Sequence, residues 1–260
     1  MISRGQMNLI RSLDRKKSRD EEGCFLAEGD KIVKELLQLP ARTAYRLRTV
    51  YGLPEWIAGN AGNPTNRPDQ LIEVSQSELD RISHLKTPNQ VLAIVELPAA
   101  SDITIDFKKD LAIGLDQVQD PGNAGTIIRL ADWFGIDCVF FSPDSADIFA
   151  PKVIQASMGS IFRVKVLKTD LQELVSRISD RFPVYGTSLD GSDIYSADIN
   201  PTGLILLGNE SKGLDPRFLP YIKANLKIPS YSTKTDYSDS LNVAIAAAII
   251  CGEFRRRFST

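Results

Sequence analysis

Two residues that could support chemistry, Asn123 and Arg129, lie in the segment DPGNAGTIIRLADWFG at residues 120–135. The segment follows the apolar run LAIGLDQV, so the pattern predicts a strand, a tight turn at residues 121–122 and a helix that Asn123 caps. On a helical wheel Arg129 falls nearly opposite the apolar face, beside Asp132. Its guanidinium could therefore serve an anion, or it could form a surface ion pair with Asp132.

Two further segments place polar side chains beside apolar runs. GNESKGL, residues 208–214, follows the run LILL and carries Glu210 just beyond a predicted buried strand. IPSYSTKTDYSDSLNVAIAAAII, residues 228–250, ends in an alanine-rich helix that Ser240 or Asp239 can cap. In a parallel sheet, ligands bind beyond the carboxyl ends of the strands, which is where we expect these three segments to lie.

Familiar phosphate-binding motifs are absent from the sequence. It contains no GxGxxG, which argues against a dinucleotide-binding fingerprint. Gly208 and Gly213 have the spacing of a P-loop, but Lys212 precedes the second glycine and Asp215 would repel a phosphate. The glycines therefore serve either tight turns or close backbone approach to a ligand without phosphates.

The counts of histidine and cysteine exclude several classes of site. His84 is the only histidine and we expect it to be structural. An HExxH zinc site needs two histidines, and a Ser-His-Asp triad would have to use His84 itself. The three cysteines are far apart and form no CxxC, which argues against a disulfide framework and a zinc site. No metal is expected, and a reducing compartment is the default.

Composition and charge predict a globular protein with a basic first segment. Hydrophobic residues make up 43% of the 260 residues, which predicts a packed core. The net charge is −2, but residues 1–50 hold eleven basic and seven acidic residues. This segment could contact phosphates, or it could be a solvated helix face of mixed charge. With no signal peptide and no run long enough to span a membrane, we expect a cytoplasmic protein.

The order of apolar runs predicts two domains. Residues 1–98 indicate a small α/β unit, and residues 99–106 have the composition of a linker. Over residues 107–260, strand-like runs alternate regularly with helical ones. This alternation predicts an α/β fold with a mostly parallel sheet and helices on both faces.

Taken together, the three segments resemble the three motifs of the SpoU family of SPOUT methyltransferases. FLAEGDKIVKELL and ISHLKTPNQVLAIVEL, within residues 1–98, resemble the family's RNA substrate-binding domain, which is similar to a small ribosomal protein. The resemblance covers nearly the whole chain. It implies methyl transfer from S-adenosylmethionine to a ribose 2′-hydroxyl in rRNA or tRNA. It also implies a deep C-terminal trefoil knot and a homodimer formed through the knotted domain.

The resemblance also implies which residues form the site. Those expected to be catalytic or substrate-positioning are Asn123, Arg129, Glu210, Ser240 and Asn242. Those expected to bind the cofactor are Leu207, Gly208, Asn209, Gly213, Ile228, Pro229, Ser240, Leu241 and Asn242. Family members are described as using the arginine as a base, but a guanidinium is almost never neutral. Stabilisation of a developing alkoxide and binding of a phosphate are the alternatives for Arg129.

Two positions depart from the family pattern. The loop at residues 230–239 is longer than usual, and Gln155 stands where many members have an arginine that meets RNA. A non-catalytic RNA-binding or ribosome-assembly protein on the same scaffold is therefore an alternative, as is an enzyme that methylates a base nitrogen. The run SLNV favours ribose and the N-terminal domain favours rRNA over tRNA. Neither DNA nor a membrane is an expected partner.

Overall fold

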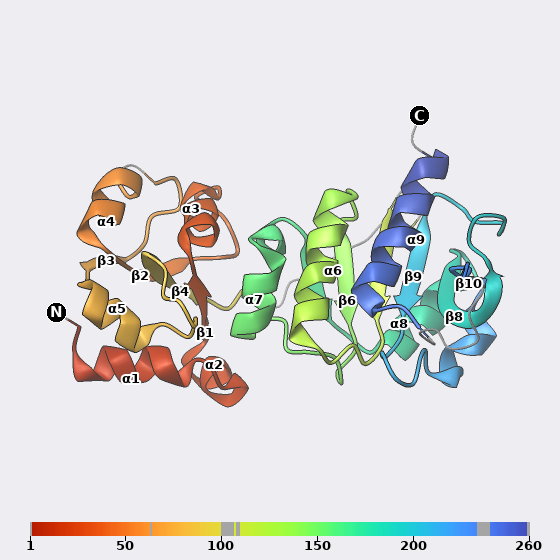
Figure 1. The fold of residues 1–260 in the computed structure, drawn as a ribbon, viewed down its shortest axis with the longest axis horizontal. Coiled ribbons are helices and arrows are strands. Elements are labelled where there is room, and N and C mark those ends of the chain that lie inside the picture. Colours follow the sequence, from red (N-terminus) through yellow and green to blue (C-terminus); the bar gives the residue numbers. More distant parts are fainter. Residues whose placement is uncertain (1, 63, 100–106, 108–109, 233–239, 259–260) are drawn as a thin grey trace. The chain divides into compact units, whose positions relative to one another are not determined.

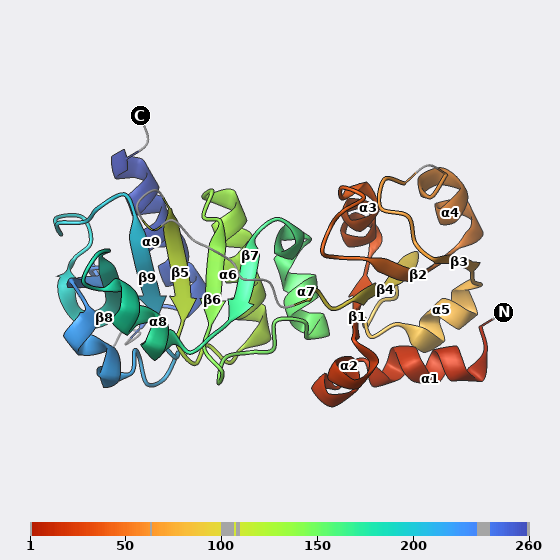
Figure 2. The ribbon, with the colours of Figure 1, turned by 180° about the vertical axis from the view of Figure 1, so that it is seen from behind.

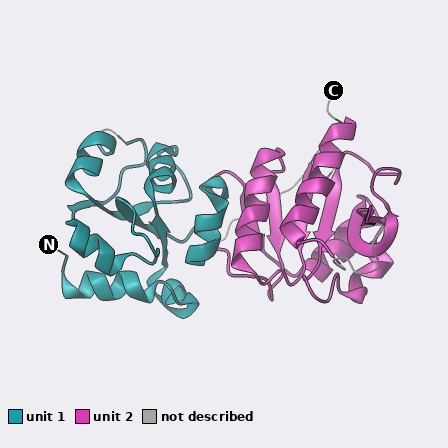
Figure 3. Ribbon diagram, in the orientation of Figure 1, with its two compact units in different colours: residues 1–102, 149–162 teal, residues 103–148, 163–260 magenta. Residues whose placement is uncertain are grey.

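The structure is a computed structural model that describes residues 2–62, 64–99, 107, 110–232 and 240–258. It divides into two compact units, shown in two colours in Figure 3. Unit 1 holds residues 1–102 and 149–162, and unit 2 holds residues 103–148 and 163–260. The expected linker at 99–106 lies outside the described residues except for Ala99.

Unit 1 is built on a sheet with the strand order β1-β4-β2-β3 (Figure 1). Strand β4 is antiparallel to both of its neighbours, and β2 is parallel to β3. The strands are β1 (Cys24–Glu28), β2 (Leu47–Gly52), β3 (Gln70–Glu73) and β4 (Val91–Glu96). The helices are α1 (Arg4–Ser12), α2 (Lys16–Glu22), α3 (Asp30–Gln38), α4 (Pro54–Asn60), α5 (Gln76–Ile82), α7 (Pro151–Ser157) and the 3-10 turn η1 (Ser160–Phe162).

Helices α1 and α5 begin at signals that our sequence analysis missed. The Ser3 hydroxyl accepts the amide of Gln6, whose side chain in turn accepts the amide of Ser3. Ser75 and Glu78 form the same reciprocal pair at the start of α5. Each is a capping box, a serine followed three residues later by a glutamine or glutamate, which satisfies two free amides at once. The spacing Ser-x-x-Gln/Glu could have located both helices.

A segment from the middle of the chain, residues 149–162, packs within unit 1. The rings of Phe25 on β1 and Phe149 have centroids 4.9 Å apart, and those of Tyr45 and Phe162 are 5.0 Å apart. The Tyr45 hydroxyl donates to the carbonyl of Ile161 at 3.0 Å, and burial raises the pKa of this phenol to about 12. The domain boundaries expected from the sequence, 1–98 and 107–260, do not place residues 149–162 with the first unit.

Unit 2 is built on a sheet of parallel strands in the order β10-β8-β9-β5-β6-β7. Figures 1 and 2 show α6 and α9 on one face of the sheet and α8 on the other. This confirms the predicted α/β fold with a parallel sheet flanked by helices. The strands are β5 (Leu111–Leu115), β6 (Cys138–Phe141), β7 (Lys165–Lys168), β8 (Val184–Asp193), β9 (Gly203–Leu207) and β10 (Ala224–Lys227). The helices are α6 (Pro121–Trp133), α8 (Leu171–Ile178), the 3-10 helix η2 (Pro216–Tyr221) and α9 (Val243–Phe258).

Strands that follow β5 in the chain are added first on one side of it and later on the other. The chain first runs outward through β6 and β7, and it later returns so that β9 pairs with the other side of β5. All five residues of β5 and of β9 are buried. Such a switch point leaves a crevice beyond the carboxyl ends of the two strands. The loops after β5 and β9 therefore meet at the position where ligands bind in sheets of this kind.

Helix α9 is held at its C-terminal end by arginines. Arg255 donates to the carbonyls of Phe134 and Gly135, both at 2.6 Å, just beyond the end of α6. Buried Glu253 accepts from Arg256 at 2.7 Å and from Arg257 at 2.6 Å, and these hydrogen bonds lower its pKa to about 2. The Arg255 hydrogen bonds fix α9 against the end of α6, so the start of α9 is presented at the same edge of the sheet as the start of α6. No helix in the described part of the chain is both long and apolar enough to cross a membrane.

The packing of residues 149–162 in unit 1 predicts a large effect of Tyr45→Ala. Loss of a partly buried ring costs about 2–3 kcal/mol, whereas Tyr45→Phe removes one hydrogen bond, worth about 1 kcal/mol. Denaturant unfolding should give a larger loss of unfolding free energy for Tyr45→Ala than for Tyr45→Phe. Hydrogen exchange of residues 149–162 should be faster in Tyr45→Ala than in the wild type. Tyr195→Phe, at an exposed ring, is the control. Unchanged exchange in residues 149–162 would contradict the assignment of this segment to unit 1.

Candidate active site

The first predicted segment begins α6, but with a different cap from the one expected. The side chain of Asp120 accepts the backbone amide of Asn123 at 2.7 Å and is the N-cap. Pro121 occupies the first turn, where a missing amide costs nothing. The prediction that Asn123 caps this helix, after a turn at residues 121–122, was therefore wrong. Because Asp120 does the capping, the side-chain amide of Asn123 is free to bond elsewhere.

The side chain of Asn123 joins all three predicted segments. Its Nδ2 donates to Oε1 of Glu210 at 2.9 Å, and its Oδ1 accepts from Nδ2 of Asn242 at 2.9 Å. An amide can donate and accept at the same time, whereas an ionised aspartate cannot donate. Residues that are 87 and 119 positions away in sequence thus meet at one side chain. Three of the five residues expected to be catalytic or positioning form this network.

The third segment is ordered by Asn242. Its Oδ1 accepts the amides of Ala244 at 2.9 Å and Ile245 at 3.3 Å, which makes it the cap of α9. Ser240, which we expected to cap this helix, lies further from its start and lines the pocket described below. The alternative cap, Asp239, and most of the long loop at 230–239 lie outside the described residues.

Arg129 is exposed on α6, as the helical wheel predicted. The alternative ion pair with Asp132 is not formed, because Asp132 instead binds Arg163 through two hydrogen bonds of 2.6 and 2.9 Å. Arg129 makes no ion pair or hydrogen bond with any residue that the structure describes. Arg129 is also not among the described residues that line the pocket presented in the next paragraph. Its guanidinium is therefore available to an external anion.

A pocket of about 560 Å³ opens beside this network, within unit 2. It has the size of a cofactor or drug-sized ligand site, roughly 300–1,000 Å³. Glu210 lines it, and so do seven of the nine expected cofactor-binding residues: Leu207, Gly208, Asn209, Gly213, Ile228, Ser240 and Leu241. Pro229 and Asn242 lie outside this lining.

The loop after β9 is folded tightly against itself. A Cβ at Gly208 would overlap the backbone of Gly213 and Leu214, so only glycine fits there. Asn209 and Gly213 exchange backbone hydrogen bonds of 2.9 Å in both directions. The Asn209 side chain donates to the carbonyl of Gln117 at 2.9 Å and accepts the amides of Ser211 and Lys212. The loop thus has a backbone conformation that is set before a ligand arrives.

Sequence reasoning missed the lining residues at 187–190 in β8. The pairing of β10 with β8 jumps from Asn225 opposite Gly186 to Leu226 opposite Ser192, which leaves the intervening residues out of the ladder. These residues bulge into the pocket wall. It also missed Val243, Ala246 and Ile250 on α9. No motif marks these positions, and only the neighbourhood of β8 and β9 in the sheet could have found them.

The pocket lining combines apolar and charged groups. Leu189, Leu207 and Leu241 provide apolar surface, while Asp190 and Glu210 supply carboxylates and Lys212 supplies an ammonium group. S-adenosylmethionine combines a flat purine with a sulfonium cation and an amino-acid end that carries both charges. The mixed lining, the volume and the crowded glycine at position 208 fit a ligand of this chemistry.

Comparisons with known proteins point to the same chemistry. The model of the SpoU rRNA Methylase family matches residues 110–252, and that of the MRM3-like substrate binding domain matches residues 5–93. The 23S rRNA (guanosine(2553)-2′-O)-methyltransferase RlmP of Bacillus subtilis is 31% identical over 249 residues, which is 94% of each chain.

Solved structures agree over the whole length. A protein of the TrmH family from Porphyromonas gingivalis is 37% identical, with a TM-score of 0.86 over 99% of each chain. An AdoMet-bound rRNA methyltransferase from Sinorhizobium meliloti is 28% identical, with a TM-score of 0.85 over 100% of this chain and 97% of that one.

The crowding at Gly208 predicts that Gly208→Ala weakens S-adenosylmethionine binding more than tenfold. The added methyl group meets backbone atoms that cannot rotate away, so residues 208–214 must open. Titration calorimetry on the full chain measures the affinity. Gly62→Ala is the control, because nothing lies within 4 Å of a Cβ there. Equal affinities for the two variants would show that the loop conformation does not matter for the ligand.

Proposed function

Since the chain belongs to the SpoU rRNA methylase family, we propose that it methylates a ribose 2′-hydroxyl of ribosomal RNA with S-adenosylmethionine. The observation that carries the proposal is the hydrogen-bonded network of Asn123, Glu210 and Asn242 beside a pocket of cofactor size. A Bacillus subtilis relative that matches 94% of the chain is named for 2′-O-methylation of 23S rRNA, which supports the choice of ribosomal RNA.

The pocket residues are assigned to cofactor binding under this proposal. When bound, S-adenosylmethionine supplies an electrophilic methyl group. Its binding is assigned to the pocket-lining residues Leu207, Gly208, Asn209, Gly213, Ile228, Ser240 and Leu241, and to Pro229 and Asn242, which follow two of them in sequence. The buried strand ends behind Leu207 and the stiff loop after it present these groups with little freedom, so less ordering is required on binding.

Arg129 acts on the RNA side of the site in this proposal. A guanidinium stays protonated at neutral pH, so it serves better as a positive charge than as a base. Its free donors can bind the phosphate beside the target ribose and stabilise the 2′-oxygen as the proton of that hydroxyl passes to water. Asn123 holds Glu210 and Asn242 in fixed positions, and Ser240 and Asn242 orient polar groups of the substrate. Alignment of the reacting atoms is the main contribution that such a rigid site makes.

Unit 1 binds the RNA substrate in this proposal. Its support is the match of residues 5–93 to a substrate-binding domain and the excess of basic residues in the first part of the chain. The domains are assigned as 1–98 for RNA binding and 107–260 for methyl transfer, with residues 149–162 packed in unit 1. The cytoplasm is the proposed location, because the Bacillus subtilis relative that matches 94% of the chain is bacterial, and bacterial ribosomal RNA is modified there.

The proposal includes a homodimer and a C-terminal trefoil knot. Trp133 on α6 is 83% exposed and Ile245 on α9 is 53% exposed, and these two helices pack together. Large apolar side chains on neighbouring helices are typical of an interface. The knot is proposed from the family to which the chain belongs.

The first experiment uses labelled S-adenosylmethionine, the full chain, and rRNA and tRNA from cells that lack it. Each RNA is digested to nucleosides after the reaction. Label in a 2′-O-methylnucleoside from rRNA is the expected result. Label in a methylated base, label confined to tRNA, or cofactor binding without transfer to any RNA would each overturn the proposed function.

The free guanidinium predicts that Arg129→Ala lowers kcat at least 100-fold while the affinity for S-adenosylmethionine changes less than threefold. Loss of a group that stabilises developing charge has an effect of this size. Arg129→Lys should recover part of the rate, because it keeps the charge but loses the forked donors. Arg177→Ala, at an exposed arginine on α8, is the control. A near-normal kcat for Arg129→Ala would remove Arg129 from the mechanism.

The proposed dimer predicts that Trp133→Glu yields monomers. A charge at the centre of an apolar contact leaves an unpaired group buried in the interface. Sedimentation velocity should show the wild type as a dimer and Trp133→Glu as a monomer at the same concentration. Leu71→Glu changes an exposed apolar side chain on β3 of unit 1 and should stay dimeric. A monomeric wild type would refute the dimer.

A further inference from the structure

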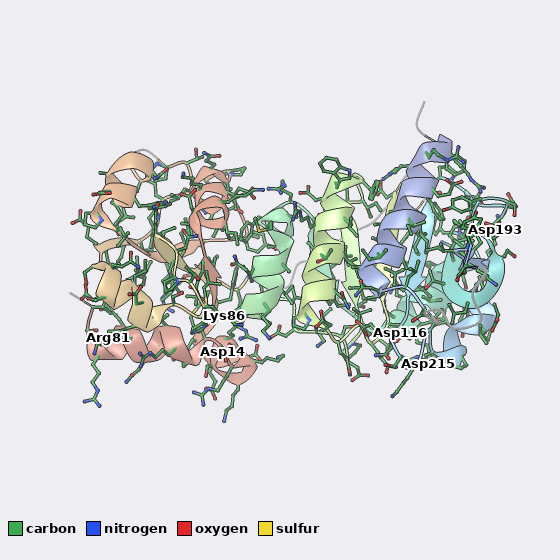
Figure 4. The ribbon with its side chains drawn as sticks, in the orientation of Figure 1. Asp14, Arg81, Lys86, Asp116, Asp193 and Asp215 are labelled. Atoms are coloured by element: carbon green, nitrogen blue, oxygen red, sulfur yellow. The ribbon has the colours of Figure 1, made fainter. Side chains whose placement is uncertain are left out.

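Asp116 is a buried acid for which the proposed reaction has no role. It follows directly after β5 and is 1% exposed. It is not among the described residues that line the pocket, and Figure 4 shows it next to Asp215, whose backbone amide it accepts. A buried carboxylate is costly unless it is hydrogen-bonded and its charge is compensated. Its presence therefore requires a structural reason.

Asp116 holds both ends of the loop that lines the pocket. Its backbone amide donates to the carbonyl of Leu207, the last residue of β9, at 2.8 Å. Its Oδ2 accepts the backbone amide of Asp215, the cap of η2, at 3.0 Å. Every residue from 208 to 214, between these two anchors, lines the pocket. One residue therefore closes this loop at its start and at its end.

The charge of Asp116 is balanced on the outer side of the loop. Nη2 of Arg217 lies 3.6 Å from Oδ1 of Asp116, and Nε of Arg217 lies 3.6 Å from Asp215. Burial raises the pKa of Asp116, which the Asp215 amide and Arg217 oppose. A hydrogen bond from an amide to a carboxylate is stronger than one to a neutral acceptor. An ionised acid at this position therefore holds the loop more firmly than an asparagine would.

The neighbouring residue adds a third attachment. Gln117 has a φ of 56°, which is uncommon for a residue other than glycine. Its amide donates to Oγ of Ser142 at 3.0 Å, and its carbonyl accepts from Asn209 in the middle of the loop at 2.9 Å. The chain thus turns sharply after Asp116 to reach the loop, and the contacts around Gln117 hold that turn.

We propose that Asp116 is a positioning residue that keeps residues 208–214 in the conformation that binds S-adenosylmethionine. The inference rests on the proposed function for the identity of the ligand, and on the hydrogen bonds to Leu207 and Asp215 for the clamp itself. Asp116 acts on the ligand through the loop and does not touch it.

The test compares Asp116→Asn with Asp193→Asn in the full chain. Asp193 is the last residue of β8 and also accepts a backbone amide, that of Tyr195 at 2.9 Å, but it is exposed and lies apart from Asp116 and Asp215 in Figure 4. Asp116→Asn should raise the KM for S-adenosylmethionine about tenfold and leave kcat within twofold. Asp193→Asn should change neither. An unchanged KM in Asp116→Asn, or a fall in kcat alone, would overturn the proposal.

A second measurement separates the clamp from the reaction. Hydrogen exchange of the ligand-free chain should be faster at residues 208–214 in Asp116→Asn, and unchanged within β5. If the wild type bound no S-adenosylmethionine, the proposed function would fail while this exchange result still tested the clamp. If Asp116→Asn did not fold, Arg217→Gln should raise exchange of the same residues, because its half-exposed side chain compensates the buried charge. Unchanged exchange in the folded variant would overturn the proposal.

Discussion

The parallel pairing of β5 with β9 is the constraint on which the active site depends. Leu111–Leu115 lie opposite Gly203–Leu207 in continuous register, and both strands are buried along their whole length. Since the strands run parallel, the loops that follow them leave the sheet at the same edge. A slip of one residue would turn every buried side chain of one strand to the opposite face. The pairing therefore places Asp116, which follows β5, beside the end of β9, where its amide bonds to the carbonyl of Leu207.

Polar contacts with little freedom are built on this pairing. Asn123 bonds to one residue from each of the other two segments, and Asn209 bonds to the turn after β5. Each amide uses a donor and an acceptor in directions that only its present rotamer allows. The two hydrogen bonds of Asn123 are open to solvent, so each adds little net stability, and their main effect is to set the positions of Glu210 and Asn242. The site is thus organised by side-chain amides and one buried acid.

Residues 149–162 are flanked in sequence by unit 2 but pack in unit 1, so the two units cannot be separated by one cut in the chain. This segment connects β6 to β7 of the parallel sheet, yet its aromatic residues pack on β1 and beside Tyr45 in unit 1. A cut made only at the linker would leave Phe149 and Phe162 without their partners. The substrate-binding unit is therefore completed by a crossover from the methyltransferase unit, and the two share more than one chain connection.

The sequence by itself determined the class of fold and the segments that form the site. Alternating apolar runs were enough to predict strands such as β5 and β9, because a strand buried on both faces must be continuously apolar. The residue pattern marked Glu210 beyond a buried strand, and the resemblance to the SpoU family added Asn123 and Asn242 to the expected site.

Only the tertiary structure decided which atoms meet. It assigned the cap of α6 to Asp120 and that of α9 to Asn242, because either choice satisfies the free amides locally and only the surroundings distinguish them. It brought residues 187–190 into the pocket through a shift of register, and it gave Asp116 its two partners in a loop about 90 residues further along the chain. Local sequence patterns carry no information on such distant pairings, because these depend on the order in which the strands assemble.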